Sequence, residues 1–353
     1  MNKVKRYVVL FLSSLVLASC GNSSSNSSSI ESSLSSNTTL ISSSSSSTVL
    51  SSSTSSNISS SNSQVSSSSS SSTKLENWPT TEDKNSTGER MTISEIYDYA
   101  KTIKLKESNG SSYSTNKDNK GNRTFDFYEN IKPKKVVFSG QYLDRSESKN
   151  PVFYSDGKVL QVYCIDNTKV ENLLDTDSAI GNTYDVTGYI TVYKYKPSIL
   201  ITKTYEEELL ECSFVKTKNA DENNTPSLDD SLIINTTVED LCKINPETSK
   251  AIDVYSNVYH FKGYLDIWEY SKEYFMAIDN LGDTCDPFKT TQFKSIRIND
   301  YDQKSYKNLK NYYLTYTIVE FNFYVFQYFN ANKKSIYEVE IINYSLSAIE
   351  ISE

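Results

Sequence analysis

The amino-acid sequence predicts a mainly β protein with short helices, built from two small β-barrels in tandem. Residues 181–202 alternate between apolar and polar side chains, turn and return, which is typical of a half-buried hairpin. The 353 residues include 27 Tyr and 14 Phe but only 10 Gly, and aromatic residues favour strands. The signals of residues 91–204 recur after residue 236, which indicates an internal duplication.

The first folded segment begins with a helix signal. Thr92-Ile-Ser-Glu95 is a capping box, and apolar residues at helical spacing follow it, so we expect a short amphipathic helix over 93–103. We expect residues 78–90 to be irregular and residues 106–121 to form a loop, because both stretches are polar. Residues 125–128 are ambiguous.

Strand signals follow the helix. Residues 136–143 predict a strand with a bulge or sharp bend at Gly140. Asp156-Gly157 lies between two apolar runs and predicts a tight hairpin turn. The expected order is then strand 152–154, strand 159–165, short helix 170–174, strand 183–193, turn 194–197, strand 198–202, and a strand or helix over 205–215.

This order of elements resembles the OB-fold, and in particular the OB-fold domains of bacterial extracellular and surface proteins, some of which lie beside secreted nucleases. Thr92-Ile-Ser-Glu95, Phe138-Ser-Gly140 and residues 181–188 carry the resemblance, which covers about 91–204. It implies two tandem OB-fold-like β-barrels after a disordered Ser-rich tether. It also implies ligand binding at the loop between the fourth and fifth strands.

The second half of the chain repeats these signals in degenerate form. Thr237-Val-Glu-Asp240 repeats the helix start, and residues 261–266 repeat 138–144 with one residue fewer. Residues 277–280 echo 164–167, and residues 311–315 echo 183–187, which would place Tyr316 where Gly188 stands. We therefore expect module 1 over 74–218, a linker over 219–235, and module 2 over 236–353.

The N-terminus resembles a lipoprotein signal. Lys3, Lys5 and Arg6 precede a short apolar run, which ends in Leu17-Ala18-Ser19-Cys20. This tetrapeptide resembles the lipobox of bacterial lipoproteins. The resemblance implies that residues 1–19 are a signal peptide, that Cys20 carries lipid, and that the lipid anchors the protein to the membrane. The expected location is the extracytoplasmic face of the cell membrane.

Residues 20–73 continue from the lipidated cysteine as a tract of mostly Ser with some Asn and Thr. Such a segment cannot bury enough apolar surface to offset its ordering entropy, so we expect disorder. It would act as a flexible tether that holds the folded part away from the membrane. Glycosylation of the serines, or adhesion through them, is the alternative.

Charge and rare residues limit the chemistry. Without residues 1–19 the chain has 33 basic and 44 acidic residues, a net charge of −11, which disfavours nucleic acid unless a local basic patch exists. His260 is the one histidine, and no metal-binding, phosphate-binding or nucleophile motif occurs. We therefore expect no enzyme activity, no metal and no cofactor. The sequence leaves open whether Cys164, Cys212, Cys242 and Cys285 form disulfides or remain thiols.

The candidate ligand-binding residues lie around the turn at 194–197. They are Tyr189, Tyr193, Lys194, Tyr195 and Lys196, since Tyr with Lys suits a phosphate, a base or a sugar ring. An ordinary solvated hairpin face is the alternative. The aromatic run at 312–329 is either a stacking platform or barrel core. Asp166 and Asp279 each follow a predicted strand and are interpreted as turn residues.

Three functions remain open at this point. The first is a non-enzymatic, membrane-anchored surface lipoprotein that binds an unknown extracellular ligand or protein partner. The second is a single-stranded nucleic-acid-binding accessory to extracellular nucleic-acid processing. The third is a structural or adhesive surface protein, in which the tether sets the reach of inert barrels.

Overall fold

The computed structural model describes residues 78–349, with gaps at 118, 120–122, 146–149, 165–169, 171–172, 175–178, 202–212, 222–224, 270–272, 284–293, 300–308, 310, 313–316, 332–333 and 343–346. The predicted signal peptide, Cys20 and the tether up to residue 73 lie outside the described residues, as do Asp166, Cys212 and Cys285. Most of the predicted element at 205–215 also lies outside. Of the short helix predicted at 170–174, residues 171–172 lie outside, and residues 170 and 173–174 are helical. The described residues belong to one compact unit, Ser68–Glu353.

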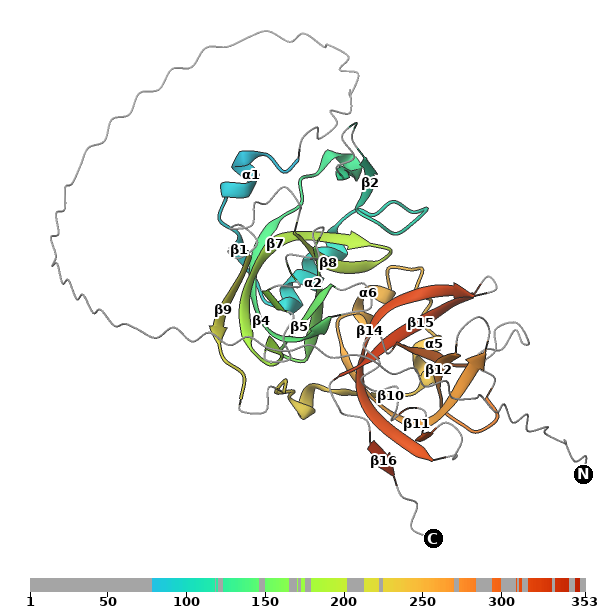
Figure 1. Ribbon diagram of the computed structural model, residues 1–353. Helices are drawn as coiled ribbons and strands as arrows, with labels where there is room; N and C mark the ends of the chain where they lie inside the picture. The colour runs from blue at the N-terminus through green and yellow to red at the C-terminus, as the bar shows by residue number, and fades with distance from the viewer. Residues whose placement is uncertain are drawn as a thin grey trace, which may run out of the picture. The chain divides into compact units, whose positions relative to one another are not determined.

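Two mixed sheets each close into a five-stranded barrel, which confirms the predicted fold class (Figure 1). The first sheet consists of β1 (Glu89–Arg90), β4 (Lys135–Arg145), β5 (Pro151–Ser155), β6 (Lys158–Cys164), β7 (Thr183–Tyr193), β8 (Lys196–Ile201) and β9 (Phe214–Lys218). Its order is β1-β4-β5-β6-β8-β7-β9, and pairing of β4 with β7 closes the barrel. Strands β6 and β8 are parallel, and the other barrel pairs are antiparallel. We call this barrel 1.

The second sheet repeats the first in strand order. It consists of β10 (Ile234–Thr236), β11 (Val258–Glu269), β12 (Glu273–Ile278), β13 (Ile296–Asn299), β14 (Ile318–Ala331), β15 (Lys334–Ile341) and β16 (Ser347–Ile349). Its order is β10-β11-β12-β13-β15-β14-β16, with β11 paired to β14 and β13 parallel to β15. This is barrel 2, and the shared order supports the duplication inferred from sequence.

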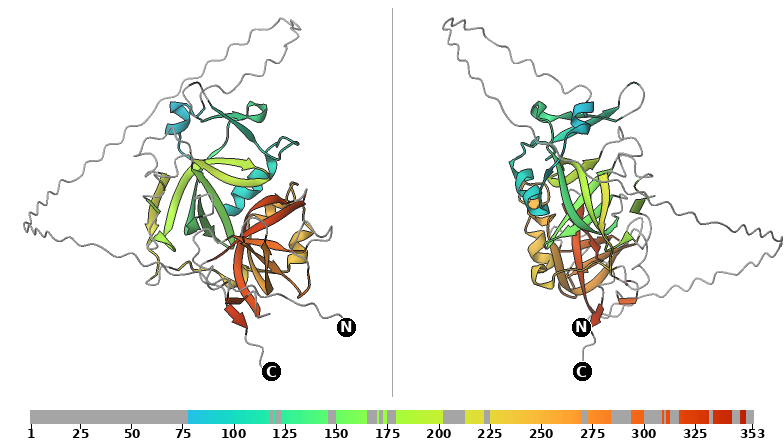
Figure 2. Two further views of the ribbon diagram at one scale, coloured as in Figure 1. Left: turned by 45° about the vertical axis from the view of Figure 1, so that its right-hand side comes forward. Right: turned by 90° about the vertical axis from the view of Figure 1, so that its left-hand side faces the viewer.

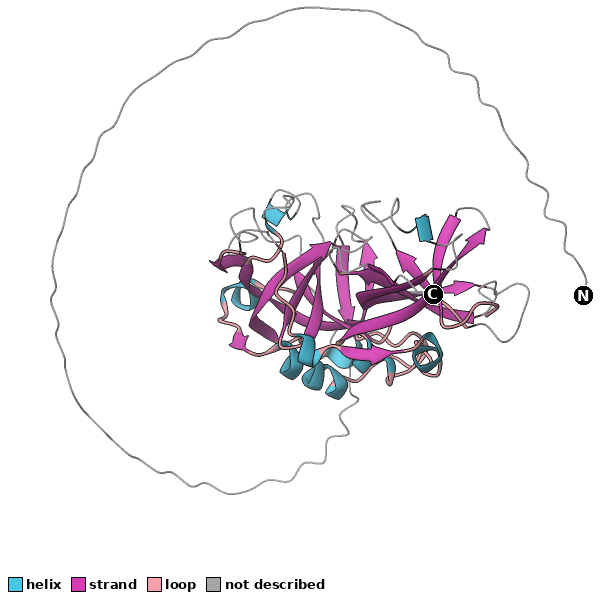
Figure 3. Ribbon diagram, turned by 90° about the horizontal axis from the view of Figure 1, so that it is seen from below, coloured by secondary structure: helices cyan, strands magenta, loops and turns pink. Residues whose placement is uncertain are grey.

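The helical segments are short and gather mostly along one side of the strands (Figure 3). They are α1 (Thr81–Asn85), α2 (Ile93–Thr102), α5 (Val238–Cys242), α6 (Ala251–Val254) and the 3-10 turns η1 (Tyr128–Asn130) and η3 (Asp230–Leu232). The predicted capping box is present, because Glu95 N donates to Thr92 Oγ1 and Thr92 N donates to Glu95 Oε2. The expectation of irregular structure over 78–90 is wrong, since α1 and β1 lie there. Thr80 and Asp83 form a second capping box that stabilises α1.

A two-stranded hairpin occupies part of the expected loop at 106–121. It consists of β2 (Tyr113–Lys117) and β3 (Arg123–Phe127), and it lies at one end of barrel 1 (Figure 2). Tyr113, Phe125 and Phe127 are buried and pack near Trp78, whose ring centroid lies 4.8 Å from that of Phe127. Residues 107–110 form a turn, but the loop prediction is wrong for 113–117, because this apolar cluster outweighs the polar composition of the segment.

The predicted irregularity in the first barrel strand occurs three residues after Gly140. Strand β4 pairs Tyr142 with Phe153 and Asp144 with Val152, so Leu143 is the extra residue of a bulge. Strand β11 pairs with β12 without a shift, which explains why the second copy of this motif has one residue fewer. Gly140 stays in register opposite Tyr184.

Strand pairing corrects two of the sequence echoes. Phe138 lies opposite Val186, whereas Phe261 lies opposite Phe321, so Phe323 rather than Tyr316 occupies the place of Gly188. Residues 277–278 end the second barrel strand, β12, whereas Cys164 ends the third, β6, so that echo does not join equivalent positions. Short similar motifs are poor guides to register when loop lengths between strands differ.

The two barrels are joined by an apolar cluster and by hydrogen bonds. The cluster contains Leu143, Val152, Tyr154, Val159, Val258, Tyr324, Phe326 and Ile342, drawn from both barrels. Tyr97 Oη donates to Tyr255 O at 2.9 Å, and Val159 N donates to Ser256 O at 2.8 Å. Burial of this apolar surface holds the barrels together more strongly than a bare linker would.

Gly188 offers a direct test of the packing inside barrel 1. A Cβ atom there would lie 2.3 Å from Ile199 Cγ2 and 3.0 Å from Leu200 O. We expect Gly188→Ala to lower the free energy of unfolding by about 1–3 kcal/mol, because β8 would have to move. Urea denaturation followed by tyrosine fluorescence measures this, with Thr187→Ala on the same strand as control. Equal stability of the two variants would contradict the tight β7–β8 packing.

Candidate ligand-binding cleft

A cleft of about 730 Å³ lies on the outside of barrel 1, between the β2–β3 hairpin and the start of β8. We call it the cationic cleft. Its lining is Tyr113, Thr115, Asn116, Lys117, Arg123, Asn150, Gln161, Tyr163, Tyr193, Lys194, Lys196 and Ser198, together with Tyr255, Phe326, Gln327 and Tyr328 from the second half of the chain. Among these described residues four side chains are cationic and none is a carboxylate.

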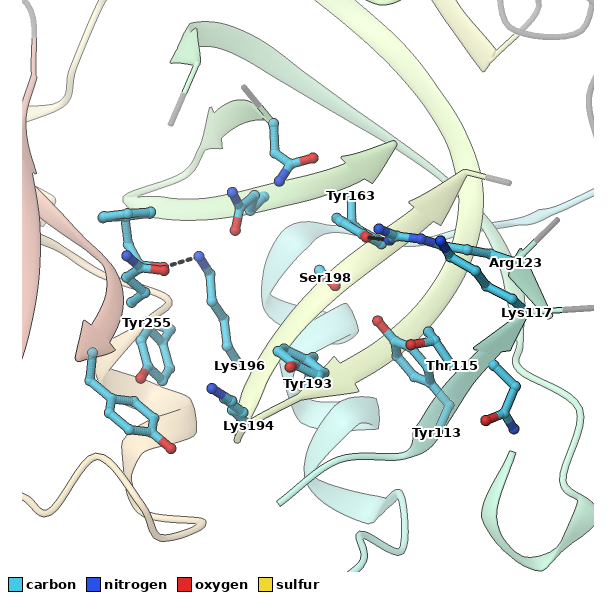
Figure 4. Close-up of a pocket in the computed structure, with 16 residues that line it drawn as sticks. Tyr113, Thr115, Lys117, Arg123, Tyr163, Tyr193, Lys194, Lys196, Ser198 and Tyr255 are labelled. Carbon is cyan, nitrogen blue, oxygen red and sulfur yellow. Dashed lines mark hydrogen bonds between the residues drawn. The ribbon is translucent and has the colours of Figure 1, made fainter. Parts of the chain in front are cut away.

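The cations form two groups at opposite ends of the cleft. Figure 4 shows Lys117 and Arg123 at one end, and Lys194 with Lys196 at the other, with Tyr193 between them. Lys117, Arg123 and Lys194 are exposed to solvent. The described part of the chain contains no carboxylate within ion-pair distance of Lys117 or Lys194, so their charges remain available to an anion.

Hydrogen bonds from the segment before β2 fix the β7–β8 turn against the hairpin. Lys194 N donates to Ser111 Oγ at 3.0 Å, and Tyr195 N donates to Gly110 O at 2.7 Å. Ser112 N donates to Val192 O at 2.8 Å on the adjacent strand. The two segments that carry three of the cleft's cations are therefore positioned relative to each other by two main-chain hydrogen bonds and one to the Ser111 hydroxyl.

The β7–β8 turn has an unusual backbone. Lys194 and Tyr195 have φ angles of 51° and 62°, in the left-handed region that favours glycine. Asp156 and Gly157 adopt the same kind of turn with φ of 51° and 74°, as their sequence predicted. Because Lys194 and Tyr195 lack that sequence preference, the bonds from residues 110–111 must hold the turn.

Lys196 differs from the other three cations because aromatic rings enclose its ammonium group. Its Nζ donates a hydrogen bond to Phe326 O and lies 5.3 Å from the Phe326 ring centroid and 5.9 Å from that of Tyr255. Burial lowers the pKa of Lys196 to about 7, although Glu340 and Glu338 attract the charged form. Lys196 therefore titrates near neutral pH, and its charge depends on what enters the cleft.

The structure places three of the five predicted ligand residues in the cleft lining: Tyr193, Lys194 and Lys196. Tyr189 is buried elsewhere, where its hydroxyl donates to Asp83 O at 2.8 Å and its ring packs on Trp78. Tyr195 is half-buried, with its ring against Gly110. Neither of these two tyrosines lines the cleft.

Sequence reasoning missed the residues that the hairpin and the second half of the chain supply. Lys117 was assigned to the loop at 106–121, and Arg123 was assigned to no element, although the alternation in Arg123-Thr-Phe-Asp-Phe127 is a strand signal. Gln327 and Tyr328 lie within the aromatic run that was open between platform and core. Phe321 and Phe323 of that run are core, and Tyr328 lines the cleft, whereas Tyr313 and Tyr316 lie outside the described residues.

The remaining sequence candidates have structural partners. His260 Nδ1 lies 2.9 Å from Asn322 Oδ1. Asp279 begins the bend that follows β12, as expected, and its carboxylate accepts hydrogen bonds from Val238 N and Glu239 N at the start of α5. Among the cysteines that the structure describes, Cys164 and Cys242 are free thiols. The described residues contain no cluster of His, Cys, Asp and Glu side chains able to hold a metal ion.

The corresponding face of barrel 2 is closed by its own side chains. When the two barrels are aligned by their strand pairing, Arg297 occupies the position of Gln161, Glu338 that of Ser198, and Ile336 that of Lys196. Arg297 Nη2 lies 3.0 Å from Glu338 Oε1, and the guanidinium lies 5.0 Å from the Phe329 ring centroid. In barrel 2 the Arg297–Glu338 ion pair thus occupies the position that corresponds to the open cleft of barrel 1.

No protein-family model matches the chain, and a comparison with curated proteins finds no match. Within the described residues, no helix has the length and apolar character needed to cross a membrane.

Proposed function

We propose that this protein is a non-enzymatic, lipid-anchored surface protein that binds an anionic ligand in the cationic cleft. The observation that supports this is the lining itself, which brings together four cations and, among its described residues, no carboxylate. The whole chain has a net charge of −8, so the fold concentrates positive charge at one place against the average. A concave site of one sign attracts ligands of the opposite sign.

Single-stranded nucleic acid is the anionic ligand that the cleft chemistry favours. Cations at both ends suit a chain with repeated negative charges, and the tyrosine between them offers a ring on which a planar base can stack. The amides of Asn116 and Gln161 add hydrogen-bonding groups to the lining. The negative net charge of the chain does not oppose this narrower proposal, because binding depends on the local electrostatic potential at the cleft.

Fluorescence anisotropy tests the proposal with a fluorescein-labelled eight-nucleotide oligo(dT). The full chain carrying Cys20→Ser, purified in mild detergent, should bind it with a Kd in about the micromolar range at low salt, and binding should weaken steeply with salt. If the protein binds a sulfated polysaccharide but not oligo(dT), the proposal of an anionic ligand stands and the narrower proposal of nucleic acid is excluded. Binding of neither would contradict the proposed cleft function and favour a structural or adhesive role.

Lipid anchoring through Cys20 rests on the lipobox resemblance and has its own test. We expect the chain expressed in a bacterium with lipoprotein processing to incorporate radiolabelled palmitate and to fractionate with membranes. Cys20→Ala should abolish the label and release the protein, whereas Cys242→Ala should change neither. A Cys20→Ala chain that remains labelled and membrane-bound would rule out this anchor.

A further inference from the structure

Strand β14, the fourth strand of barrel 2, contains a β-bulge that its counterpart β7 in barrel 1 lacks. Val325 pairs with Val339 and Gln327 pairs with Glu338, so Phe326 is an extra residue between them. In barrel 1 the corresponding pairs, Ile190 with Ile199 and Thr191 with Ser198, follow each other without a shift. Barrel 2 therefore has one residue more than barrel 1 at the point where β14 borders the cationic cleft.

Phe326 makes two contacts from this bulge. Its side chain is buried in the apolar cluster that joins the barrels, which also contains Leu143 and Val258. Its main-chain carbonyl accepts the hydrogen bond from Lys196 Nζ of barrel 1. The bulge therefore connects the packing of the two barrels to the position of one cleft cation.

The residues directly after the bulge belong to the cleft lining. Gln327 Nε2 donates to Glu338 Oε2 at 2.6 Å, which orients the amide. The Tyr328 ring lies 5.9 Å from Lys194 Nζ, near the β7–β8 turn. Both side chains are partly exposed, so a ligand in the cleft can reach them.

We propose that barrel 2 is one wall of the ligand site of barrel 1, with Gln327 and Tyr328 contacting the ligand and Phe326 positioning Lys196. This inference rests on the proposed function, because it concerns the same cleft. Barrel 2 is then not a second binding barrel. The Arg297–Glu338 pair closes its own face, and its strand β14 lines the cleft of barrel 1. Tyr328 adds a stacking surface, and Gln327 adds an amide that can discriminate between bases.

The test measures binding of the labelled eight-nucleotide oligo(dT) to the full chain with Cys20→Ser. Tyr328→Ala should raise the Kd at least about fivefold, as expected for loss of one stacking partner. Tyr264→Ala, which removes a partly buried tyrosine of barrel 2 outside the cleft lining, should leave the Kd unchanged. Gln327→Ala should change the ratio of Kd values for oligo(dT) and oligo(dA), whereas Asn330→Ala at the end of β14 should not.

Deletion of Phe326 tests the positioning role, since barrel 1 shows that this strand pair can run without the extra residue. The deletion should weaken binding and move the midpoint of its pH dependence upward, because Lys196 would lose one of the two aromatic rings that enclose its ammonium group. If the deletion variant fails to fold by circular dichroism, Phe326→Leu gives the same readout, with a smaller upward shift of the midpoint. An unchanged midpoint in a folded variant contradicts the positioning role.

The outcomes separate this inference from the proposed function. Oligo(dT) binding by the unaltered chain, combined with unchanged Kd values for Tyr328→Ala and Gln327→Ala, contradicts the inference and leaves the proposed function intact. No binding by the unaltered chain contradicts the proposed function and the inference together. Weakened binding in the Tyr328 variant with normal binding in the Tyr264 control supports both.

Discussion

Replacing Lys117 and Lys194 together by alanine is expected to weaken oligo(dT) binding about 30-fold. The two side chains are exposed, lie at opposite ends of the cationic cleft, and have no carboxylate partner among the described residues. A contact between an exposed ammonium and a phosphate contributes about 1 kcal/mol, and two distant contacts add. Because neither lysine supports a packed element, the loss should appear in affinity and not in folding.

Salt dependence makes this prediction more specific. The slope of log Kd against log salt should fall by about 1.4 in the double variant, because two fewer counterions are released from the single strand. Lys132→Ala with Lys243→Ala is the matched control, since it removes the same charge from lysines paired with Asp83 and Asp240. Equal weakening in the control would show that net charge, rather than the cleft, governs binding.

The second large effect is expected from Lys196→Met, which should impair binding and remove a pH dependence of stability. In the folded chain burial lowers the pKa of Lys196 to about 7, whereas in the unfolded chain it has the ordinary value of about 10.4. Between these values the unfolded chain binds more protons, so the free energy of unfolding should rise with pH from about 7 upward. Below pH 7 both states are protonated, and the cost of the enclosed charge is fully present.

Chemical denaturation between pH 6 and 9 measures this contribution. Lys196→Met should be more stable than the unaltered chain at pH 6, because the methionine side chain fits between aromatic rings without an enclosed charge. The difference should shrink as pH rises. Lys194→Met, at an exposed neighbour, serves as control and should show the pH dependence of the unaltered chain. A constant difference between Lys196→Met and the unaltered chain over this range would contradict the assignment of the shift to Lys196.

Binding should follow the opposite trend with pH. An anion in the cleft is attracted to protonated Lys196, so affinity for oligo(dT) should decrease as pH rises through about 7. The phosphodiester charge is constant in this range, and the change therefore reports on the protein. Lys196→Met should bind more weakly than the unaltered chain at pH 6 and should lack this decrease.

Local signals in the sequence predicted the parts of the fold that depend on local chemistry. The capping box at Thr92 and the Asp156-Gly157 turn occur where expected, because each is determined by residues close together in the chain. The alternation in β7 holds over 183–188, but residues 188–192 are buried on both faces, since distant residues such as Trp78 cover Tyr189. The register of β14 could not be predicted in this way. It is set by pairing with β11 and β15, and an alternating aromatic run fits several registers nearly equally well.

The cleft was predicted in part for the same reason. Tyr193, Lys194 and Lys196 lie within one turn and could be recognised together. Arg123 and Tyr328 are separated from that turn by about seventy and more than a hundred residues, and only the folded topology brings them to it. Their residue types gave no signal, because an arginine in a polar stretch and a tyrosine in an aromatic run both have ordinary explanations.

The left-handed backbone at Lys194 and Tyr195 has a consequence for how this protein could change under selection. Left-handed φ angles at non-glycine residues cost on the order of 1 kcal/mol each, so Asn-Gly in their place would give a more heat-resistant chain. That exchange would also delete a cation from the candidate site. Selection for thermal stability and selection for ligand affinity would therefore oppose each other at this turn. A protein that keeps Lys-Tyr here would be one in which selection for affinity is the stronger of the two.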